Sequence, residues 1–202
     1  VRAKYGVADG DYYLTSIDGS FQNLFQTKTD GVDIGVKGAI PTAFGDFALD
    51  IDGTYTHSYR VFSPTLNGFG DNQAGRYTYP KFVVNTTVSY KVGNFDQSLR
   101  YVFNSSTALK QDFDDTTWDT AGCASNGLSA SECRVHTYHR VDYNVTYTGV
   151  KNLTVGLFIG NLFQRRPPVD YRAFGVPSGV IPSSTEDAQG RTGKIVLSYK
   201  FL

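Results

Sequence analysis

The stretch from Phe47 to Val61 alternates apolar and polar side chains with a period of two, and this pattern constrains the fold strongly. Its odd positions are mostly aromatic or aliphatic, whereas its even positions are small, polar or charged and include Asp50, Asp52 and Arg60. Successive side chains point to opposite faces in an extended strand. The pattern therefore predicts a β-strand with one apolar face along the odd positions and one polar face along the even positions.

The same alternation recurs along most of the chain and predicts an all-β fold. Residues 1–20 show it weakly and are expected to form one further strand, or a hairpin broken at Ala8–Asp11. The predicted fold is an antiparallel up-and-down sheet of about seven to eight long strands. The seven clear strands are Val32–Ile40, Phe47–Val61, Phe82–Val92, Phe95–Phe103, Val135–Tyr147, Leu153–Ile159 and Ile195–Phe201.

The connections between these strands alternate in length. Outer-membrane β-barrels have this layout, with short periplasmic turns and long extracellular loops, and their strands can project beyond the bilayer on the loop side. Short turns are predicted at Pro41–Asp46, Gly93–Asn94 and Gly149–Asn152. Long polar segments are predicted at Ser63–Arg76, Gln111–Arg134 and Pro167–Gly190.

Aromatic residues near the ends of the apolar faces favour a transmembrane barrel. Phe47 lies on the same predicted face as Tyr55, and Phe82 on the same face as Tyr90. Such residues form girdles at both membrane interfaces. A soluble ligand-binding β-barrel would instead turn its apolar face inward, and alternation alone does not decide which face lies inside. No apolar run approaches the roughly 20 residues of a membrane helix, so a membrane crossing would use strands.

Composition and motifs argue against two classes of function. Nineteen Lys and Arg residues balance nineteen Asp and Glu residues, so no nucleic-acid partner is expected from a chain without a basic excess. No Gly-x-Ser-x-Gly nucleophile motif is present, and the adjacent His57 and Ser58 should point to opposite faces of a strand. We therefore expect no enzymatic activity.

The two cysteines of the chain, Cys123 and Cys133, lie close together in a polar segment. This spacing favours a local disulfide formed in an oxidising compartment, and two free thiols are the alternative. A zinc site would need further ligands, and only His136 and His139 lie near the cysteines. No metal or other cofactor is expected.

Three motifs, in the same order along the chain, resemble those of TonB-dependent outer-membrane receptors. Thr27–Gly35 (TKTDGVDIG) is similar to a family pattern with Gly-Val-Asp or Gly-Leu-Asp. Gly160–Pro168 (GNLFQRRPP) is similar to an Asn-Leu-Phe-Asp tetrad followed by a Pro-Pro pair. The last strand follows Gly190-Arg191 and ends in Ser-Tyr-Lys-Phe, as in the family. The chain departs from the family at Gln164, where an acidic residue is usual, and at Leu202, which follows the terminal aromatic residue.

The resemblance implies that residues 1–202 are the C-terminal portion of a receptor barrel, without its plug domain and earlier strands. Such receptors have about 22 strands around a plug. The resemblance implies outer-membrane lipid, the barrel-assembly machinery, the TonB complex and an extracellular small-molecule substrate as partners. It assigns the assembly signal to Tyr199 and Phe201. The loop residues expected to contact a ligand are Phe113, Trp118, Tyr171, Arg172 and Phe174.

The function expected from this resemblance is uptake of a scarce nutrient, such as a siderophore-iron complex, cobalamin or an oligosaccharide, energised through TonB. Two alternatives remain open from the residues themselves. One is a complete small eight-stranded outer-membrane barrel with a structural or adhesion role. The other is a soluble β-barrel that binds a hydrophobic ligand.

Overall fold

The computed structural model describes residues 2–8, 11–18, 26–64, 66–76, 79–109, 120–169 and 189–201. Within these residues the chain is almost entirely antiparallel β-structure, as predicted. The main sheet has the strand order β12-β11-β10-β7-β6-β4-β3, with the short β5 attached to β4. Its strands are β3 (Thr27–Thr42), β4 (Gly45–Ser63), β5 (Gly68–Phe69), β6 (Phe82–Val92), β7 (Phe95–Asn104), β10 (Tyr138–Val150), β11 (Leu153–Gly160) and β12 (Thr192–Tyr199).

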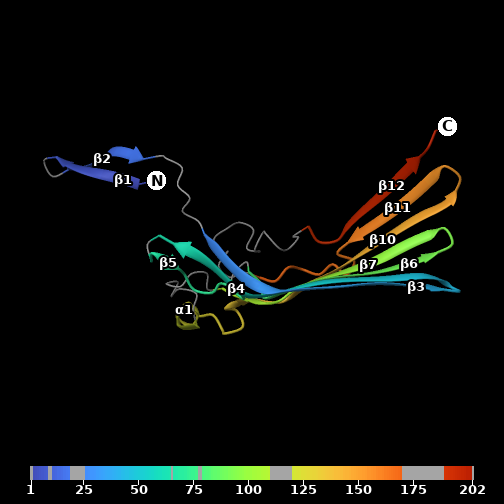
Figure 1. Cartoon of the computed structure of the whole chain (residues 1–202), viewed down its shortest axis with the longest axis horizontal. Coiled ribbons are helices and arrows are strands. Elements are labelled where there is room, and N and C mark those ends of the chain that lie inside the picture. Colours follow the sequence, from blue (N-terminus) through green and yellow to red (C-terminus); the bar gives the residue numbers. More distant parts are fainter. Residues whose placement is uncertain are drawn as a thin grey trace.

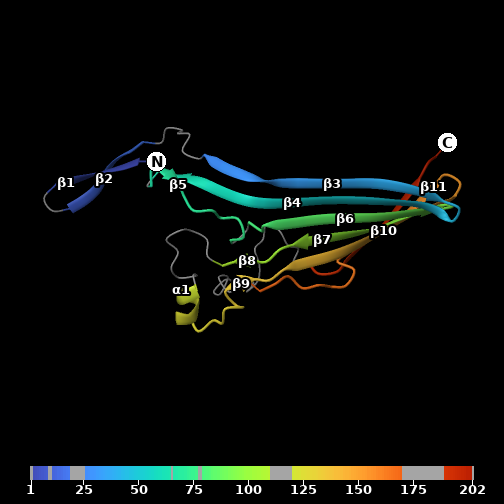
Figure 2. The ribbon, with the colours of Figure 1, turned by 60° about the horizontal axis from the view of Figure 1, so that its bottom comes forward.

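The sheet is a curved open surface, with short turns at one end and long connections at the other (Figures 1 and 2). The short turns join β3 to β4, β6 to β7 and β10 to β11, which confirms the three predicted turns. We call these the turn end and the loop end of the sheet. The long connections contain α1 (Thr120–Ser125) and a two-stranded ribbon of β8 (Thr107–Ala108) and β9 (Arg134–Val135).

The register keeps the apolar residues of neighbouring strands on one face of the sheet. Leu49 of β4 lies opposite Val88 of β6, which lies opposite Leu99 of β7, and Leu99 lies opposite Tyr143 of β10. Tyr143 in turn lies opposite Ile159 of β11. Many of these side chains are exposed, so the apolar face stays uncovered within the described chain.

Stacked aromatic pairs mark both ends of this apolar face. Phe47 stacks on Tyr90 near the turn end, with ring centroids 4.4 Å apart. Tyr55 stacks on Phe82 toward the loop end, with centroids 4.7 Å apart. These cross-strand pairs lie where the sequence predicted aromatic girdles.

A β-bulge at His57 interrupts the predicted alternation of β4. Val32 of β3 pairs with Tyr55, whereas Thr29 pairs with Tyr59, so the register shifts by one residue between Asp30 and Gly31. Thr29 is three residues from Val32 and lies on the opposite face of β3. The prediction that Tyr59 and Val61 continue the apolar face is therefore wrong, because an extra residue moves them to the polar face.

The predicted strands of the main sheet differ in length in the structure. β3, β4 and β10 have 16, 19 and 13 residues, which exceeds the roughly 9–11 residues of a tilted membrane strand. In contrast, β6 and β7 have 11 and 10 residues, and β11 and β12 have 8 each. Only the first three therefore support the expected projection at the loop end.

The N-terminal residues form a hairpin, which is one of the two possibilities that the sequence left open. β1 (Arg2–Ala8) pairs with β2 (Asp11–Asp18), and Ala8 lies opposite Asp11 at the turn. The two strands form a separate sheet and are not hydrogen-bonded to β3 within the described chain (Figure 1).

Candidate functional site

Buried apolar side chains of the described residues gather at the loop end of the sheet. Leu109 is 0% exposed and Tyr138 is 2% exposed, and Ala74, Cys123 and Val135 are also buried. They come from two long connections and from the first residue of β10. The long connections therefore form a small packed core of their own, whereas the sheet leaves most of its large apolar residues exposed.

The connection from β4 to β6 is held against β4 by Asn72. The Asn72 Oδ1 accepts hydrogen bonds from the backbone N of Tyr59 at 3.0 Å and of Ala74 at 2.9 Å. Its Nδ2 donates to the carbonyl oxygen of His57 at 2.9 Å. One amide side chain thus caps the bulge and fixes the returning loop. Sequence reasoning missed Asn72, because no periodicity marks a residue whose partners are backbone groups of another segment.

The two connections from β4 to β6 and from β7 to β10 are joined to each other. The backbone N of Ala108 donates to the carbonyl oxygen of Gly75 at 2.9 Å, and Arg76 forms a parallel bridge with Ala108. Arg134 Nη2 also donates to Ser106 Oγ at 3.0 Å, which ties the returning end of the second connection to its start. The two connections therefore present one surface at the loop end of the sheet.

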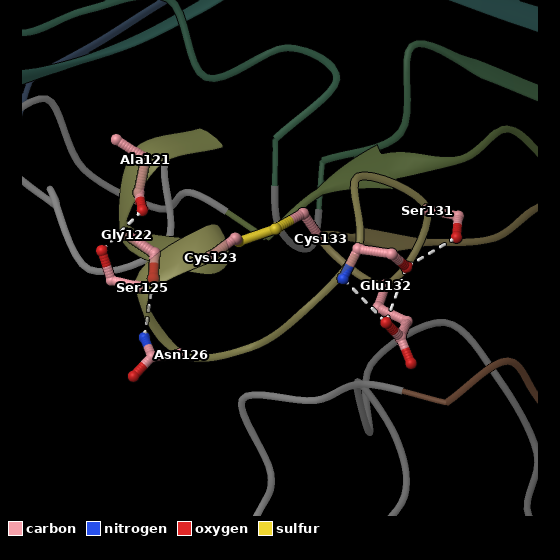
Figure 3. Close-up of a disulfide and its surroundings, with 9 residues drawn as sticks. Ala121, Gly122, Cys123, Ser125, Asn126, Ser131, Glu132 and Cys133 are labelled. Carbon is pink, nitrogen blue, oxygen red and sulfur yellow. Dashed lines mark hydrogen bonds between the residues drawn. A yellow bond between two sulfur atoms is a disulfide. The ribbon is translucent and has the colours of Figure 1, made fainter.

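Cys123 of α1 and Cys133 form a disulfide, with Cα atoms 6.0 Å apart (Figure 3). This separation lies within the range of ordinary disulfides. The turn between them is closed by Glu132, whose Oε2 accepts hydrogen bonds from Ser129 N at 2.8 Å and Ser129 Oγ at 2.6 Å. Cys133 also links to the rest of the connection, because its carbonyl oxygen accepts from the backbone N of Leu109 at 3.1 Å.

The polar face of the sheet carries charged residues in neighbouring strands. Lys37 Nζ lies 3.0 Å from Asp50 Oδ2, and Arg140 Nε lies 3.1 Å from Asp142 Oδ1. Between these pairs, Arg100 Nη2 donates to Asn85 Oδ1 at 3.2 Å. The alternation of residues 47–61 predicted that Asp50 lies on this polar face, and the register confirms it. The alternation also predicted Arg60 on this face, which is wrong, because the bulge turns Arg60 to the apolar face.

The Asn-Leu-Phe-Gln motif forms a tight turn after β11. Asn161 and Gln164 both have φ 52°, in the left-handed region, and Asn161 is 2% exposed. The backbone N of Asn161 donates to Asp142 Oδ1 at 2.8 Å, and the N of Leu162 donates to the carbonyl oxygen of Val141 at 2.7 Å. Asp142 thus joins the polar face of the sheet to the start of the third long connection.

The predicted ligand contacts are not placed by this structure. Phe113, Trp118, Tyr171, Arg172 and Phe174 lie outside the described residues and stay predictions. No group of three or more His, Cys, Asp or Glu side chains suited to a metal ion occurs in the described part of the chain. No helix in that part has the length and apolar character needed to cross a membrane.

The predicted assembly-signal residues lie at the turn end of the sheet. Tyr199 is the last residue of β12, and its ring makes an edge contact with Phe201 at a centroid distance of 5.0 Å. Phe201 is 90% exposed. The chain is held beside them by a hydrogen bond from Lys200 N to the carbonyl oxygen of Asn152 at 2.9 Å.

Comparison with known proteins agrees with this architecture. Residues 5–162 match the sequence profile of the family described as TonB dependent receptor-like, beta-barrel. A comparison with curated protein sequences gives no significant match.

Two solved structures share the fold at low sequence identity. One is a mutant of the ferric enterobactin receptor PfeA from Pseudomonas aeruginosa, with TM-score 0.51 and 17% identity over 86% of this chain and 22% of that one. The other is the ferric yersiniabactin uptake receptor FyuA from Yersinia pestis, with TM-score 0.54 and 18% identity over 89% of this chain and 24% of that one. The chain therefore spans less than a quarter of the length of either structure.

Proposed function

The chain belongs to the TonB-dependent receptor-like β-barrel family, and from this membership we propose that it contributes strands to an outer-membrane receptor that imports a scarce extracellular ligand. The resemblance inferred from the three sequence motifs is confirmed by the profile match. Membership in a family of receptors also agrees with the expectation that the chain is not an enzyme.

The main support for the proposal is that the sheet has one apolar face and one polar face. Its apolar face runs across the strands from Leu49 to Ile159, with stacked aromatic pairs toward both ends. Its polar face carries ion pairs such as Lys37 with Asp50. In a receptor barrel the apolar face contacts lipid and the polar face lines the lumen. The proposal therefore includes a location in the outer membrane of a Gram-negative bacterium.

The motifs of the last strand support a place for residues 1–202 in the C-terminal part of the receptor barrel. In this proposal the plug domain and the contact with the TonB complex belong to other parts of the receptor. Tyr199 and Phe201 lie at the turn end, the periplasmic end in this orientation, where the barrel-assembly machinery would bind them. The intact mass of the native protein tests this place. A mass several times 22.2 kDa supports it, and a mass near that value favours the small-barrel alternative.

We propose a ferric siderophore as the first ligand class to test, because both similar structures are named as receptors for such complexes. The ligand would contact the loop end of the sheet. Trp118 and Phe113 belong to the connection that also contains the Cys123–Cys133 disulfide. Tyr171, Arg172 and Phe174 belong to the connection that follows the Asn161 turn. Cobalamin and oligosaccharides are the competing ligand classes.

Uptake by whole cells tests the function. A strain that lacks the gene should lose uptake of one radiolabelled ligand class, and the gene on a plasmid should restore it only when TonB is present. A Trp118→Ala variant should lower uptake at low ligand concentration, whereas Leu66→Ala, which removes an exposed apolar loop residue, should not. Unchanged uptake of all three ligand classes in the deletion strain would contradict the proposal.

A further inference from the structure

Two cations face each other across β3 and β4 on the apolar side of the sheet. Lys28 pairs in register with Arg60, and both side chains are exposed. Lys28 is four residues from Val32 on a regular strand, so both cations lie on the face that carries Val32 and Tyr55. Like charges directly opposite each other destabilise an antiparallel pair. A counter-ion from outside the chain would remove this cost.

The described residues do not supply that counter-ion. Asp30 lies on the same face, but its Oδ2 is 2.7 Å from Nδ1 of His57. Lys28 Nζ lies 4.3 Å above the centroid of the Phe69 ring, and no ion pair joins Lys28 or Arg60 to a described residue. The patch formed by Lys28 and Arg60 therefore carries an excess of positive charge.

The position of Lys28 and Arg60 along the membrane normal, relative to the stacked aromatic rings, indicates which groups could approach these two cations. The stacked Tyr55 and Phe82 rings mark the interface at the loop end. Lys28 lies four residues beyond Val32, the partner of Tyr55, which is about 13 Å along the strand. At a strand tilt of about 40° this distance is roughly 10 Å along the membrane normal. This height lies just beyond the headgroup layer, which covers roughly 5–8 Å outside each side of the hydrocarbon core. The long Lys28 and Arg60 side chains can reach back into that layer, as such side chains do near membrane interfaces.

We propose that Lys28 and Arg60 form a binding site for the phosphate group of an outer-leaflet lipid. The guanidinium of Arg60 can bind two phosphate oxygens, and the ammonium of Lys28 adds a second charge. Phe62 and Phe69, whose rings meet edge to face at 5.7 Å, provide apolar contact beside the cations. The bulge at His57 creates the site, because without it Arg60 would face the lumen. This inference rests on the outer-membrane placement proposed above.

Lipid binding to the native protein in detergent tests the proposal. Diphosphoryl lipid A is titrated into the protein, and the lipid-bound fraction is measured by native mass spectrometry. The Lys28→Gln/Arg60→Gln variant should bind roughly 30-fold more weakly, since each basic residue near an anionic surface contributes about a fivefold factor. The matched control Arg165→Gln/Arg166→Gln removes two exposed cations from the loop after β11 and should leave binding unchanged.

Three further binding measurements identify the source of the phosphate and test whether a loss of binding reflects misfolding of the variant. Dephosphorylated lipid A should bind the unaltered protein as weakly as diphosphoryl lipid A binds the double variant. Inorganic phosphate in large excess should not displace the lipid. The charge-conserving variant Lys28→Arg/Arg60→Lys should retain most of the binding, which separates loss of charge from loss of structure.

The outcomes separate this inference from the proposed function. Equal binding of diphosphoryl and dephosphorylated lipid A, or unchanged binding by the double variant, would overturn the lipid site. Displacement by inorganic phosphate would show a free-anion site and would also overturn it. Absence of the native protein from the outer-membrane fraction would instead contradict the proposed function.

Discussion

The side chain of Asn161 holds the backbone of Arg165 through two hydrogen bonds. Its Oδ1 accepts from the backbone N of Arg165 at 2.7 Å, and its Nδ2 donates to the carbonyl oxygen of the same residue at 2.8 Å. Asn161 itself has a positive φ of 52° and is buried. Asparagine suits this position because it tolerates the left-handed conformation and carries both a donor and an acceptor.

Replacement of Asn161 should loosen the turn after β11. Asn161→Ala loses both side-chain hydrogen bonds and should destabilise the turn by about 1–3 kcal/mol. Cleavage by trypsin between Arg165 and Arg166 should then become faster. Asn161→Gly is the control, because glycine also tolerates a positive φ but lacks the amide. If Asn161→Gly were as resistant to trypsin as the unaltered protein, backbone conformation rather than side-chain hydrogen bonding would hold the turn.

A side chain at Gly31 should disturb the bulge. A Cβ at this position would fall against the carbonyl oxygen of Tyr55, well inside contact distance. Gly31→Ala should therefore destabilise the barrel by about 1–3 kcal/mol, measured as a lower temperature for loss of the folded band on an unboiled gel. Gly38→Ala on the same strand is the matched control, because a Cβ there meets no atom within 4 Å. Equal transition temperatures for the two variants would refute the steric argument.

Removal of the disulfide should affect the loop and not the sheet. Disulfides contribute about 2–4 kcal/mol by restricting the unfolded chain, and the Cys123–Cys133 bond closes a local segment. In the Cys123→Ser/Cys133→Ser variant, a glutamate-specific protease should cleave faster after Glu132. The temperature at which the barrel unfolds should stay unchanged. The unaltered protein treated with a reductant serves as the second sample and should behave in the same way. Equal cleavage rates in all samples would show that the loop does not depend on the bond.

Two carboxylates of the polar face should differ in their contribution to stability. Asp142 is 5% exposed and accepts from the backbone N of Asn161 as well as pairing with Arg140. Asp142→Ala should destabilise the protein by about 3 kcal/mol or more, because it removes a buried partner from both groups. The pair of Asp50 with Lys37 is exposed and screened by solvent, so Asp50→Ala should have little effect. The temperature at which each variant loses its folded band on an unboiled gel would measure both effects. A larger loss of stability for Asp50→Ala than for Asp142→Ala would contradict this ranking.

Loss of the exposed ring of Phe201 should impair assembly. If this residue is part of the assembly signal, Phe201→Ala should lower the amount of folded protein in the outer membrane severalfold. Phe44→Ala removes a similarly exposed aromatic ring from the β3–β4 turn and is the control. Immunoblots of outer-membrane fractions would measure both variants. Equal reductions for both would indicate a general effect of exposed aromatic residues at the turn end.

Much of the architecture was predictable because it depends on local alternation. The period of two located seven of the eight strands of the main sheet, all but the two-residue β5, and the clusters of Gly, Asn and Pro located its three short turns. Antiparallel pairing then follows, because short turns force consecutive strands to lie side by side. The motif around Asn161 was recognisable as a family feature. Its hydrogen bonds to Arg165 and Asp142 were not, because they need coordinates.

Only the tertiary structure revealed the register shift between β3 and β4. The residues from Val32 to Ile40 and from Phe47 to Tyr55 alternate without interruption, and nothing beyond Tyr55 signals an inserted residue. The shift becomes visible only when Thr29 is found opposite Tyr59. Pairing is a property of two strands, so the face that Arg60 occupies depends on its partner strand and not on β4 alone.

The sequence by itself determined the strands, their turns and the family, because alternation and short motifs are local properties of the chain. The tertiary structure decided how the long connections pack through Asn72 and Leu109, and which face the residues beyond His57 occupy. These features depend on contacts between segments far apart in the chain. Their physical cause is that backbone groups and side chains must find partners in three dimensions, and no periodicity in one segment encodes the position of another.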